Sequence, residues 1–392
     1  MYRNRNRRQN TVGIIRYSCG FLFIAFVFCY LAFLRGEVLA EVQHVLSNGL
    51  THYSVYIGAF IITALLQLLQ LVVSRLIRVP DKCYFLTYVP SFVALAMLIG
   101  MDQNMDGKFV WGVWRWLLPL IILAWLIVLF ILRRFEFTEK EDRSTTIQSR
   151  MWPNYMMLLA MICACGFVSN TPAVDQYELK TERLLLQKNY EAAAAVGIQS
   201  LDATERLTQL RAYALSKQGL LGDSLFTYPQ YYGESGLLDI HDTVSSRRFP
   251  MENIEYYLGG AAGQSVKSNQ RFLEILALED SVPSEQSRQY LLCHYLLCRN
   301  LHSFDKTLHT VYGDTIKEML PRHYQEAVIM QHAYTPDSLP IYINKVYVER
   351  FAQYDSLKRS ITDPVERKNR TRRVFGDTYW WYYENQTAQT SW

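Results

Sequence analysis

The sequence lacks the motifs that usually mark a catalytic centre. It contains no Gly-rich phosphate loop, no serine-nucleophile motif and no pair of metal-binding histidines. The formal net charge is only +4 over 392 residues, so bulk electrostatics gives no support to nucleic-acid binding. We therefore expect a non-enzymatic protein, without a cofactor, a metal or a nucleic-acid partner.

The seven cysteines do not form a disulfide pattern. Five of them lie in or beside apolar runs, where thiols behave as small hydrophobic groups: Cys19, Cys29, Cys83, Cys163 and Cys165. Cys293 and Cys298 stand five positions apart on a predicted helix and point to different faces, too far apart for a normal bridge. His294 between them invites a metal interpretation, but the sequence offers no second pair of ligands, so we expect core packing there.

Long apolar runs, in contrast, fill the first part of the chain. Each is about as long as a helix needs to cross ~30 Å of hydrocarbon, and lipid leaves the backbone no alternative to a helix. No acidic or basic residue lies near the middle of a run, which removes the usual mark of an ion pathway. The sequence thus predicts a transmembrane domain over residues 1–169. Its five spans are 17–34, 54–74, 83–101, 113–132 and 152–169.

Basic residues predict the orientation of these spans, because Lys and Arg of short connections are retained in the cytoplasm. The N-terminal segment and the connections after the second and fourth runs carry thirteen Lys or Arg. The opposite connections carry three, namely Arg35, Lys108 and Arg115. Five spans then place residues 170–392 outside the cytoplasm. Cleavage of a signal peptide after Val38–Ala40 is an alternative for the first run, and it leaves the remaining topology unchanged.

From residue 175 onward, apolar residues recur at helical spacing between breaks at Gly and Pro. Short connections favour antiparallel helix pairs. The segment "NYEAAAAVG" resembles part of a tetratricopeptide repeat through Tyr190 and Ala193, although Lys180 and Thr181 replace the expected Leu and Gly of the preceding helix. We predict an all-α protein: a five-helix transmembrane bundle followed by a tetratricopeptide-like solenoid of helical hairpins over residues 170–392.

A long loop, Phe226 to Pro250, interrupts the predicted helices. Loops of this length are more often functional than ordinary connectors. Its aromatic residues Tyr228, Tyr231 and Tyr232 are our candidates for contact with a partner protein.

Three segments carry a resemblance to a known family. "LSKQGLLGDSLFTYPQYYGESGLL" (Leu215–Leu238), "LPRHYQEAV" (Leu320–Val328) and "VFGDTYWWYY" (Val374–Tyr383) follow the apolar spans in that order. In this they resemble a family of uncharacterised inner-membrane proteins from Bacteroidetes. The resemblance covers most of residues 175–385 and implies a bacterial inner-membrane protein with a periplasmic, tetratricopeptide-like second half. The family has no established activity to transfer.

Aromatic and basic residues gather near the end of the sequence, and they allow two interpretations. Basic residues beside Trp and Tyr suit the boundary between lipid headgroups and water, where the segment would join a Trp belt at the fourth span. Alternatively, the aromatic residues pack into the last hairpin as a core cap. The cluster comprises Trp111, Trp114, Trp116, Arg372, Arg373, Tyr379, Trp380, Trp381, Tyr382 and Tyr383.

The segment "DQNMDG" reproduces the first six positions of a calcium loop through Asp102, Asn104 and Asp106. Val113 replaces the acid required at the twelfth position, so a polar turn between two spans explains these residues better.

Taken together, the features predict a membrane-tethered periplasmic scaffold with the lipid bilayer and a protein or peptide as partners. The alternative is a component of envelope polysaccharide or lipid-linked assembly, with a substrate groove in the spans.

Overall fold

Helices make up most of the chain that the computed structural model describes. The chain divides into two compact units, Met1–Pro172 (unit 1) and Ala173–Trp392 (unit 2). The predicted all-α class is confirmed, apart from one pair of two-residue strands. The described residues are 2–47, 50–51, 53–77, 79–100, 102–103, 109–110, 112–135, 147–168, 173–241, 248–260, 266–280, 282–313, 320–334 and 343–385.

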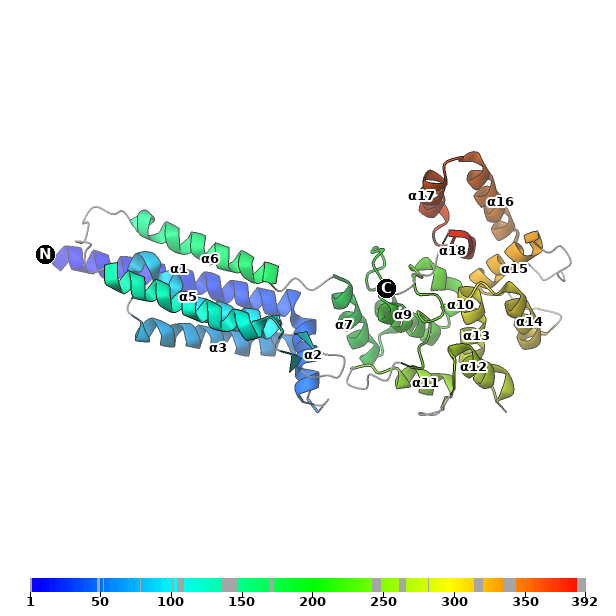
Figure 1. The fold of residues 1–392 in the computed structure, drawn as a ribbon, viewed down its shortest axis with the longest axis horizontal. Coiled ribbons are helices and arrows are strands. Elements are labelled where there is room, and N and C mark those ends of the chain that lie inside the picture. The colour runs from blue at the N-terminus through cyan, green and yellow to red at the C-terminus, as the bar shows by residue number, and fades with distance from the viewer. Residues whose placement is uncertain are drawn as a thin grey trace. The chain divides into compact units, whose positions relative to one another are not determined.

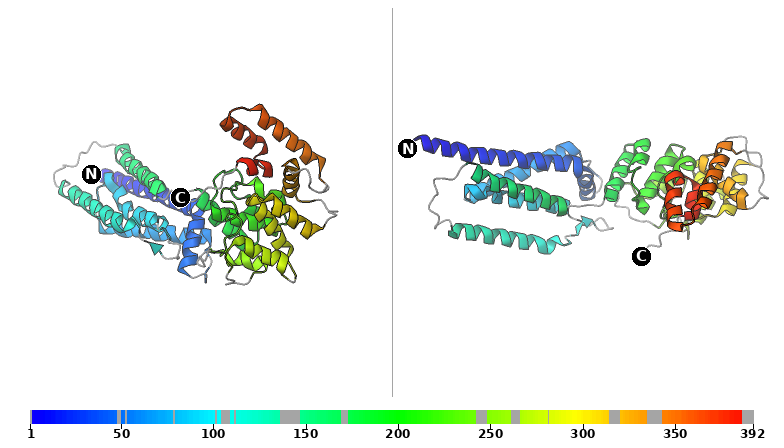
Figure 2. Two further views of the ribbon diagram at one scale, coloured as in Figure 1. Left: turned by 45° about the vertical axis from the view of Figure 1, so that its right-hand side comes forward. Right: turned by 90° about the horizontal axis from the view of Figure 1, so that it is seen from above.

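The long helices of unit 1 lie side by side with nearly parallel axes, whereas the short helix over residues 36–46 runs across them (Figures 1 and 2). The two strands pair in an antiparallel manner between α4 and α5, with Asp102 opposite Val110. The elements are α1 (Tyr2–Cys29), the π-helical η1 (Tyr30–Leu34), α2 (Gly36–Leu46), α3 (Val55–Leu76), the 3-10 segment η2 (Asp81–Tyr88), α4 (Val89–Ile99), β1 (Asp102–Gln103), β2 (Phe109–Val110), α5 (Trp114–Phe135) and α6 (Ile147–Val168).

Four helical stretches are long and apolar enough to cross a membrane, the pattern of a multi-pass membrane protein. They are Gly13–Leu34, Val55–Leu76, Lys82–Ile99 and Trp114–Leu132. The fifth predicted span is helical as well, but its apolar part, Met151–Phe167, is shorter than the other four. Polar residues such as Gln148 and Asn154 occupy the first turns of α6 and limit that apolar length. The predicted count of five spans is therefore not established by the structure.

Side chains from α5 and α6 satisfy backbone groups in the 3-10 segment of unit 1. The Phe85 N–H donates to Asn154 Oδ1 at 2.8 Å, and Trp125 Nε1 donates to the Leu86 carbonyl at 3.0 Å. Asn154 is fully buried. Since hydrocarbon offers no hydrogen-bond partner, a departure from α-helical bonding at membrane depth requires such contacts.

A second polar contact joins α3 to the same segment. Gln70 is fully buried, and its Nε2 donates to Tyr84 Oη at 3.0 Å and to Thr87 Oγ1 at 2.9 Å. Gln67 Nε2 in turn donates to Gln70 Oε1 at 3.0 Å. Polar residues inside spans commonly bond to neighbouring helices in this way.

Unit 2 consists of shorter helices whose successive members pack against one another, for example α7 on α8 and α9, and α13 on α14. Other contacts join segments far apart in the chain, because α15 packs against α10 and also against α18. The elements are α7 (Ala173–Leu186), α8 (Tyr190–Ala195), α9 (Glu205–Lys217), α10 (Leu221–Ser224), η3 (Leu225–Thr227), α11 (Glu252–Leu258), α12 (Asn269–Glu274), the π-helical η4 (Ile275–Glu279), α13 (Glu285–Leu297), α14 (Leu301–Tyr312), α15 (Arg322–Tyr334), α16 (Lys345–Ser360), α17 (Pro364–Phe375) and α18 (Tyr379–Asn385).

Candidate binding groove

A buried acidic residue organises the centre of unit 2. Glu326 on α15 is fully buried, and its Oε1 accepts from Arg322 Nε at 2.8 Å. Its Oε2 lies 3.0 Å from His323 Nδ1 and accepts from the Tyr379 N–H at 2.7 Å. A buried carboxylate is stable in a fold only when its oxygens are paired in this manner.

The same network extends to two other segments of unit 2. Asp223 at α10 accepts the Arg322 N–H at 2.7 Å, and the Phe226 N–H donates to His323 Nε2 at 3.3 Å. The His323 ring proton therefore lies on Nδ1, facing Glu326. Asp377, just before α18, receives Arg322 Nη2 at 2.9 Å through one oxygen and Arg350 Nη2 at 2.9 Å through the other. All three segments that carried the sequence resemblance thus meet around α15.

The arrangement holds both acids in their charged form. Burial acts to raise the pKa of Glu326, but the contacts from His323, Arg322 and the Tyr379 N–H bring it below its ordinary value. Burial likewise opposes ionisation of Asp377, yet Arg322 and Arg350 lower the pKa of its carboxyl group. Opposite charges and hydrogen bonds to the charged form outweigh desolvation at both positions.

The aromatic residues near the end of the sequence form α18 and lie inside unit 2. Tyr379 and Trp380 are fully buried, and Trp381 and Tyr382 are each 5 % exposed. Trp380 Nε1 donates to the Glu326 carbonyl at 2.8 Å, and Tyr382 Oη donates to the Leu297 carbonyl at 2.8 Å. Tyr383 is partly buried against the same core. These side chains belong to the core of unit 2 and leave little aromatic surface for a lipid boundary.

A groove of about 560 Å³ opens beside this core. Its walls come from the start of the long loop, residues 226–230, and from α17 and α18. Arg372 donates from Nη2 to Tyr231 Oη at 3.0 Å and lies over the Trp381 ring, with its Cζ 5.3 Å from the ring centroid. The structure thus brings together two sets of candidate residues that are far apart in the sequence.

Two donor groups that line the groove make no hydrogen bond or ion pair with the described residues. Arg373 is exposed and makes no hydrogen bond or ion pair within the part of the chain that the structure describes. The Trp381 Nε1–H is buried and has no hydrogen-bond partner among the described residues. Asp377 also lines the groove, but its charge is balanced by the two arginines named above. Both of these groups are donors, which suit an anionic or carbonyl-bearing ligand.

The loop tyrosines are less exposed than the sequence suggested. Tyr228 is 8 % exposed, and its ring centroid lies 5.0 Å from Arg211 Cζ. Tyr231 and Tyr232 are half-buried, and Tyr232 Oη donates to the Ala203 carbonyl at 3.1 Å. These three residues hold the loop on the helices, while the groove is open along Thr227 and Leu201.

The remaining candidate residues belong to unit 1, and some of them fall outside the residues that the structure describes. Trp114 is buried and donates from Nε1 to the Gly100 carbonyl at 3.0 Å, whereas Trp116 is 76 % exposed. Asp102 belongs to β1. Asn104, Asp106 and Trp111 lie outside the described residues, so the calcium-loop interpretation stays a sequence prediction.

One part of unit 2 is similar to a known protein family. Residues 263–386 match a family model described as "Family of unknown function (DUF6057)". No curated protein and no solved structure matches the chain. The matched region contains "LPRHYQEAV" and "VFGDTYWWYY", which build the network around Glu326, and it agrees with the predicted resemblance to an uncharacterised family.

Proposed function

We propose that this protein is a membrane-tethered scaffold whose second half binds an acidic protein or peptide segment in the groove of unit 2. The observation that carries the proposal is the exposed Arg373 and the unpartnered Trp381 N–H in a groove whose walls are partly polar and partly apolar. Carboxylates pair readily with arginine, and a buried unpartnered N–H favours a ligand that supplies an acceptor. The large core of unit 2 supports the residues that line such a site.

We further propose that unit 2 lies in the periplasm of a bacterial inner-membrane protein. The asymmetry of thirteen against three basic residues in the connections supports an N-terminus in the cytoplasm. The periplasmic placement also requires α6 to cross the bilayer, as a short fifth span. A topology reporter fused after Trp392 tests this: activity of a periplasm-dependent reporter supports the placement, and activity confined to the cytoplasm contradicts it.

Site-specific photo-crosslinking in native membranes tests the binding proposal. A crosslinker at Leu201 or Thr227, both exposed on the groove, is expected to capture one partner. The same crosslinker at Val365, 68 % exposed and outside the groove, is the control position.

Charge reversal at Arg373 then distinguishes binding in the groove from nonspecific crosslinking. Arg373→Glu is expected to abolish capture from Leu201, because it places a like charge opposite an acidic ligand. Lys368→Glu, on the same helix and exposed, is the matched control and should retain capture. Equal capture by both variants would contradict the proposal.

A second function is favoured by a separate observation in unit 1. A cavity of about 1030 Å³ is lined by Arg16, Arg75, Gln67 and Gln70, among others. A cavity that combines basic and amide groups with apolar walls suits an anionic lipid or lipid-linked intermediate, as expected for a component of envelope assembly. The two proposals differ in one result: only the scaffold predicts that residues 170–392 alone retain the partner in a pull-down.

A further inference from the structure

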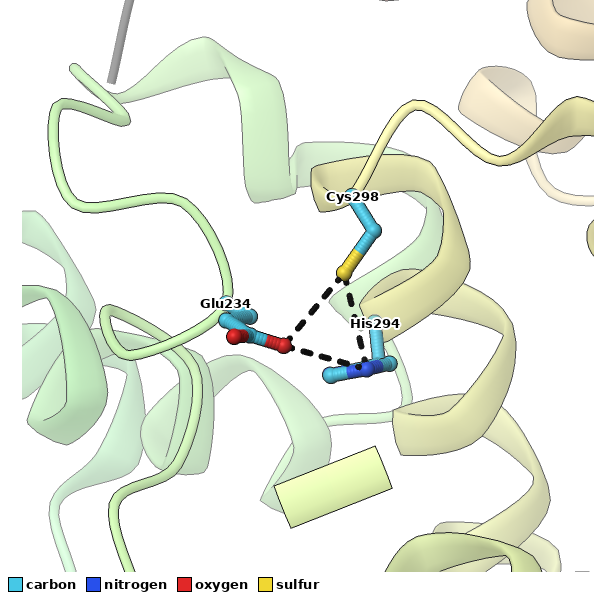
Figure 3. Close-up of side chains that lie close together, drawn as sticks. All are labelled: Glu234, His294 and Cys298. Atoms are coloured by element: carbon cyan, nitrogen blue, oxygen red, sulfur yellow. Dashed lines mark hydrogen bonds and ion pairs between the residues drawn. The ribbon is translucent and has the colours of Figure 1, made fainter. Parts of the chain in front are cut away.

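Three potential metal ligands from two separate segments converge in unit 2 (Figure 3). His294 and Cys298 are one helical turn apart at the end of α13, so both side chains project to the same side. Glu234 reaches them from the long loop that follows η3. The sequence predicts core packing at His294 and gives no sign of Glu234, because the carboxylate belongs to a distant segment.

The distances among the three ligand atoms are nearly equal. Cys298 Sγ lies 3.5 Å from His294 Nε2 and 3.5 Å from Glu234 Oε2, and His294 Nε2 lies 3.5 Å from Glu234 Oε2. A strong nitrogen-to-oxygen hydrogen bond is shorter, at about 2.7–3.2 Å. Zinc with bonds of about 2.0–2.3 Å in tetrahedral geometry separates its ligand atoms by roughly 3.3–3.7 Å. The 3.5 Å between His294 Nε2 and Glu234 Oε2 exceeds that range, and all three separations match the edges of a zinc coordination sphere.

One side of the triangle is buried in unit 2 and the other is open to solvent, as expected for a metal ion held by three protein groups. The His294 ring is 1 % exposed, and its Nδ1 has no hydrogen-bond partner among the described residues, so Nε2 is the ring atom directed at the other two groups. The Glu234 side chain is 55 % exposed, which leaves the outer side open to solvent. Three protein ligands with one solvent position are typical of zinc sites that retain an exchangeable water.

We infer that Glu234, His294 and Cys298 form a Zn²⁺ site that fastens the long loop to the end of α13. The mixture of one sulfur, one nitrogen and one oxygen ligand favours Zn²⁺ over the oxygen-preferring Ca²⁺ and Mg²⁺. Binding transfers the Cys298 thiol proton to solvent, so that the thiolate ligates the ion. Because residues 226–230 of the same loop line the groove, the ion stabilises one groove wall as well.

Titration of the purified full-length protein in detergent with Co²⁺, followed by displacement with Zn²⁺, tests this inference. The wild-type chain is expected to bind one ion with a sulfur-to-cobalt charge-transfer absorption that Zn²⁺ removes and Ca²⁺ does not. Zn²⁺ should also raise its unfolding temperature. Cys298→Ser should lose the charge-transfer absorption, and Glu234→Gln should weaken binding at least ~10-fold, by analogy with the loss of supporting groups around a zinc ion.

Matched controls keep the test independent of folding. Cys163→Ser replaces another exposed cysteine, and Glu191→Gln replaces another exposed glutamate, so both should bind Co²⁺ as the wild type does. Glu234 lies on an exposed turn, and its replacement by Gln is expected to leave the fold intact. Absence of stoichiometric binding, or identical cobalt absorption in wild type and Cys298→Ser, would overturn the inference.

Discussion

The polar groups buried at the depth of the spans in unit 1 differ in kind from those at the centre of unit 2. At the depth of the spans in unit 1, the buried contacts described above are neutral, as in Gln70 and Asn154. The centre of unit 2 instead holds the charged residues Arg322 and Glu326. Burying a charge in hydrocarbon costs far more than burying an amide, so the neutral choice is suited to a membrane. A charged core is stable only in a unit that can surround it with fixed donors and acceptors.

The largest expected effect comes from removing the central acid of unit 2. Glu326→Ala leaves Arg322, His323 and the Tyr379 N–H without their acceptor, and should destabilise unit 2 by about 3–5 kcal/mol. Hydrogen exchange, measured by mass spectrometry on peptides of α15 and α18, should rise strongly while α3 peptides change little.

Glu366→Ala is the matched control for this prediction. Glu366 is an exposed acid paired with Arg370 at 2.9 Å, and such surface pairs contribute only about 0.3–0.5 kcal/mol. Equal protection of α18 in the Glu326 and Glu366 variants would mean that the buried network does not hold the aromatic helix in place.

Acid should affect the two units unequally as well. The pKa values of Glu326 and Asp377 are lowered in the folded state, so their stabilising contribution is complete above the ordinary values of 4.5 and 3.8. This contribution is lost progressively as the pH falls from there through the lower folded values. Amide protection factors, corrected for the intrinsic pH dependence of exchange, should fall first in unit 2 between pH 7 and pH 3, with the neutral contacts of α3 and η2 largely retained. Simultaneous loss of both units would contradict the comparison.

Sequence reasoning succeeded where one local property decides the structure. An apolar run of sufficient length forms a helix in any surroundings without water, which is why four spans were predictable. The aromatic segment was ambiguous because Trp and Tyr suit a lipid boundary and a protein core equally well. Two of its buried residues donate hydrogen bonds to Glu326, which lies in another segment of the chain. The proximity of Glu234 to His294 and Cys298 could not be predicted for the same reason, since only the folded loop brings these residues together.

A prediction of intermediate size concerns the backbone of the 3-10 segment in unit 1. Asn154→Ala leaves the Phe85 N–H without its acceptor and should destabilise unit 1 by about 1–3 kcal/mol. Unfolding in mixed micelles measures the loss, and exchange at the Phe85 amide should increase. Asn154→Asp is a useful companion, because it keeps an acceptor oxygen but adds a charge at a fully buried position. A milder effect from Asp than from Ala would imply that water reaches this position.

The smallest effect is expected for Gln70→Leu. Its amide bonds to Tyr84 and Thr87 join α3 to η2, but contacts of this kind between membrane helices contribute only about 0.6 kcal/mol on average. Leu nearly preserves the volume, and Thr87 Oγ1 keeps its bond to the Tyr84 carbonyl. Unfolding in mixed micelles should therefore barely distinguish Gln70→Leu from the control Ser74→Ala on the same helix. A loss as large as that for Glu326→Ala would show instead that the buried amides of unit 1 hold it together as strongly as the charged network holds unit 2, and the contrast between the two interiors would no longer stand.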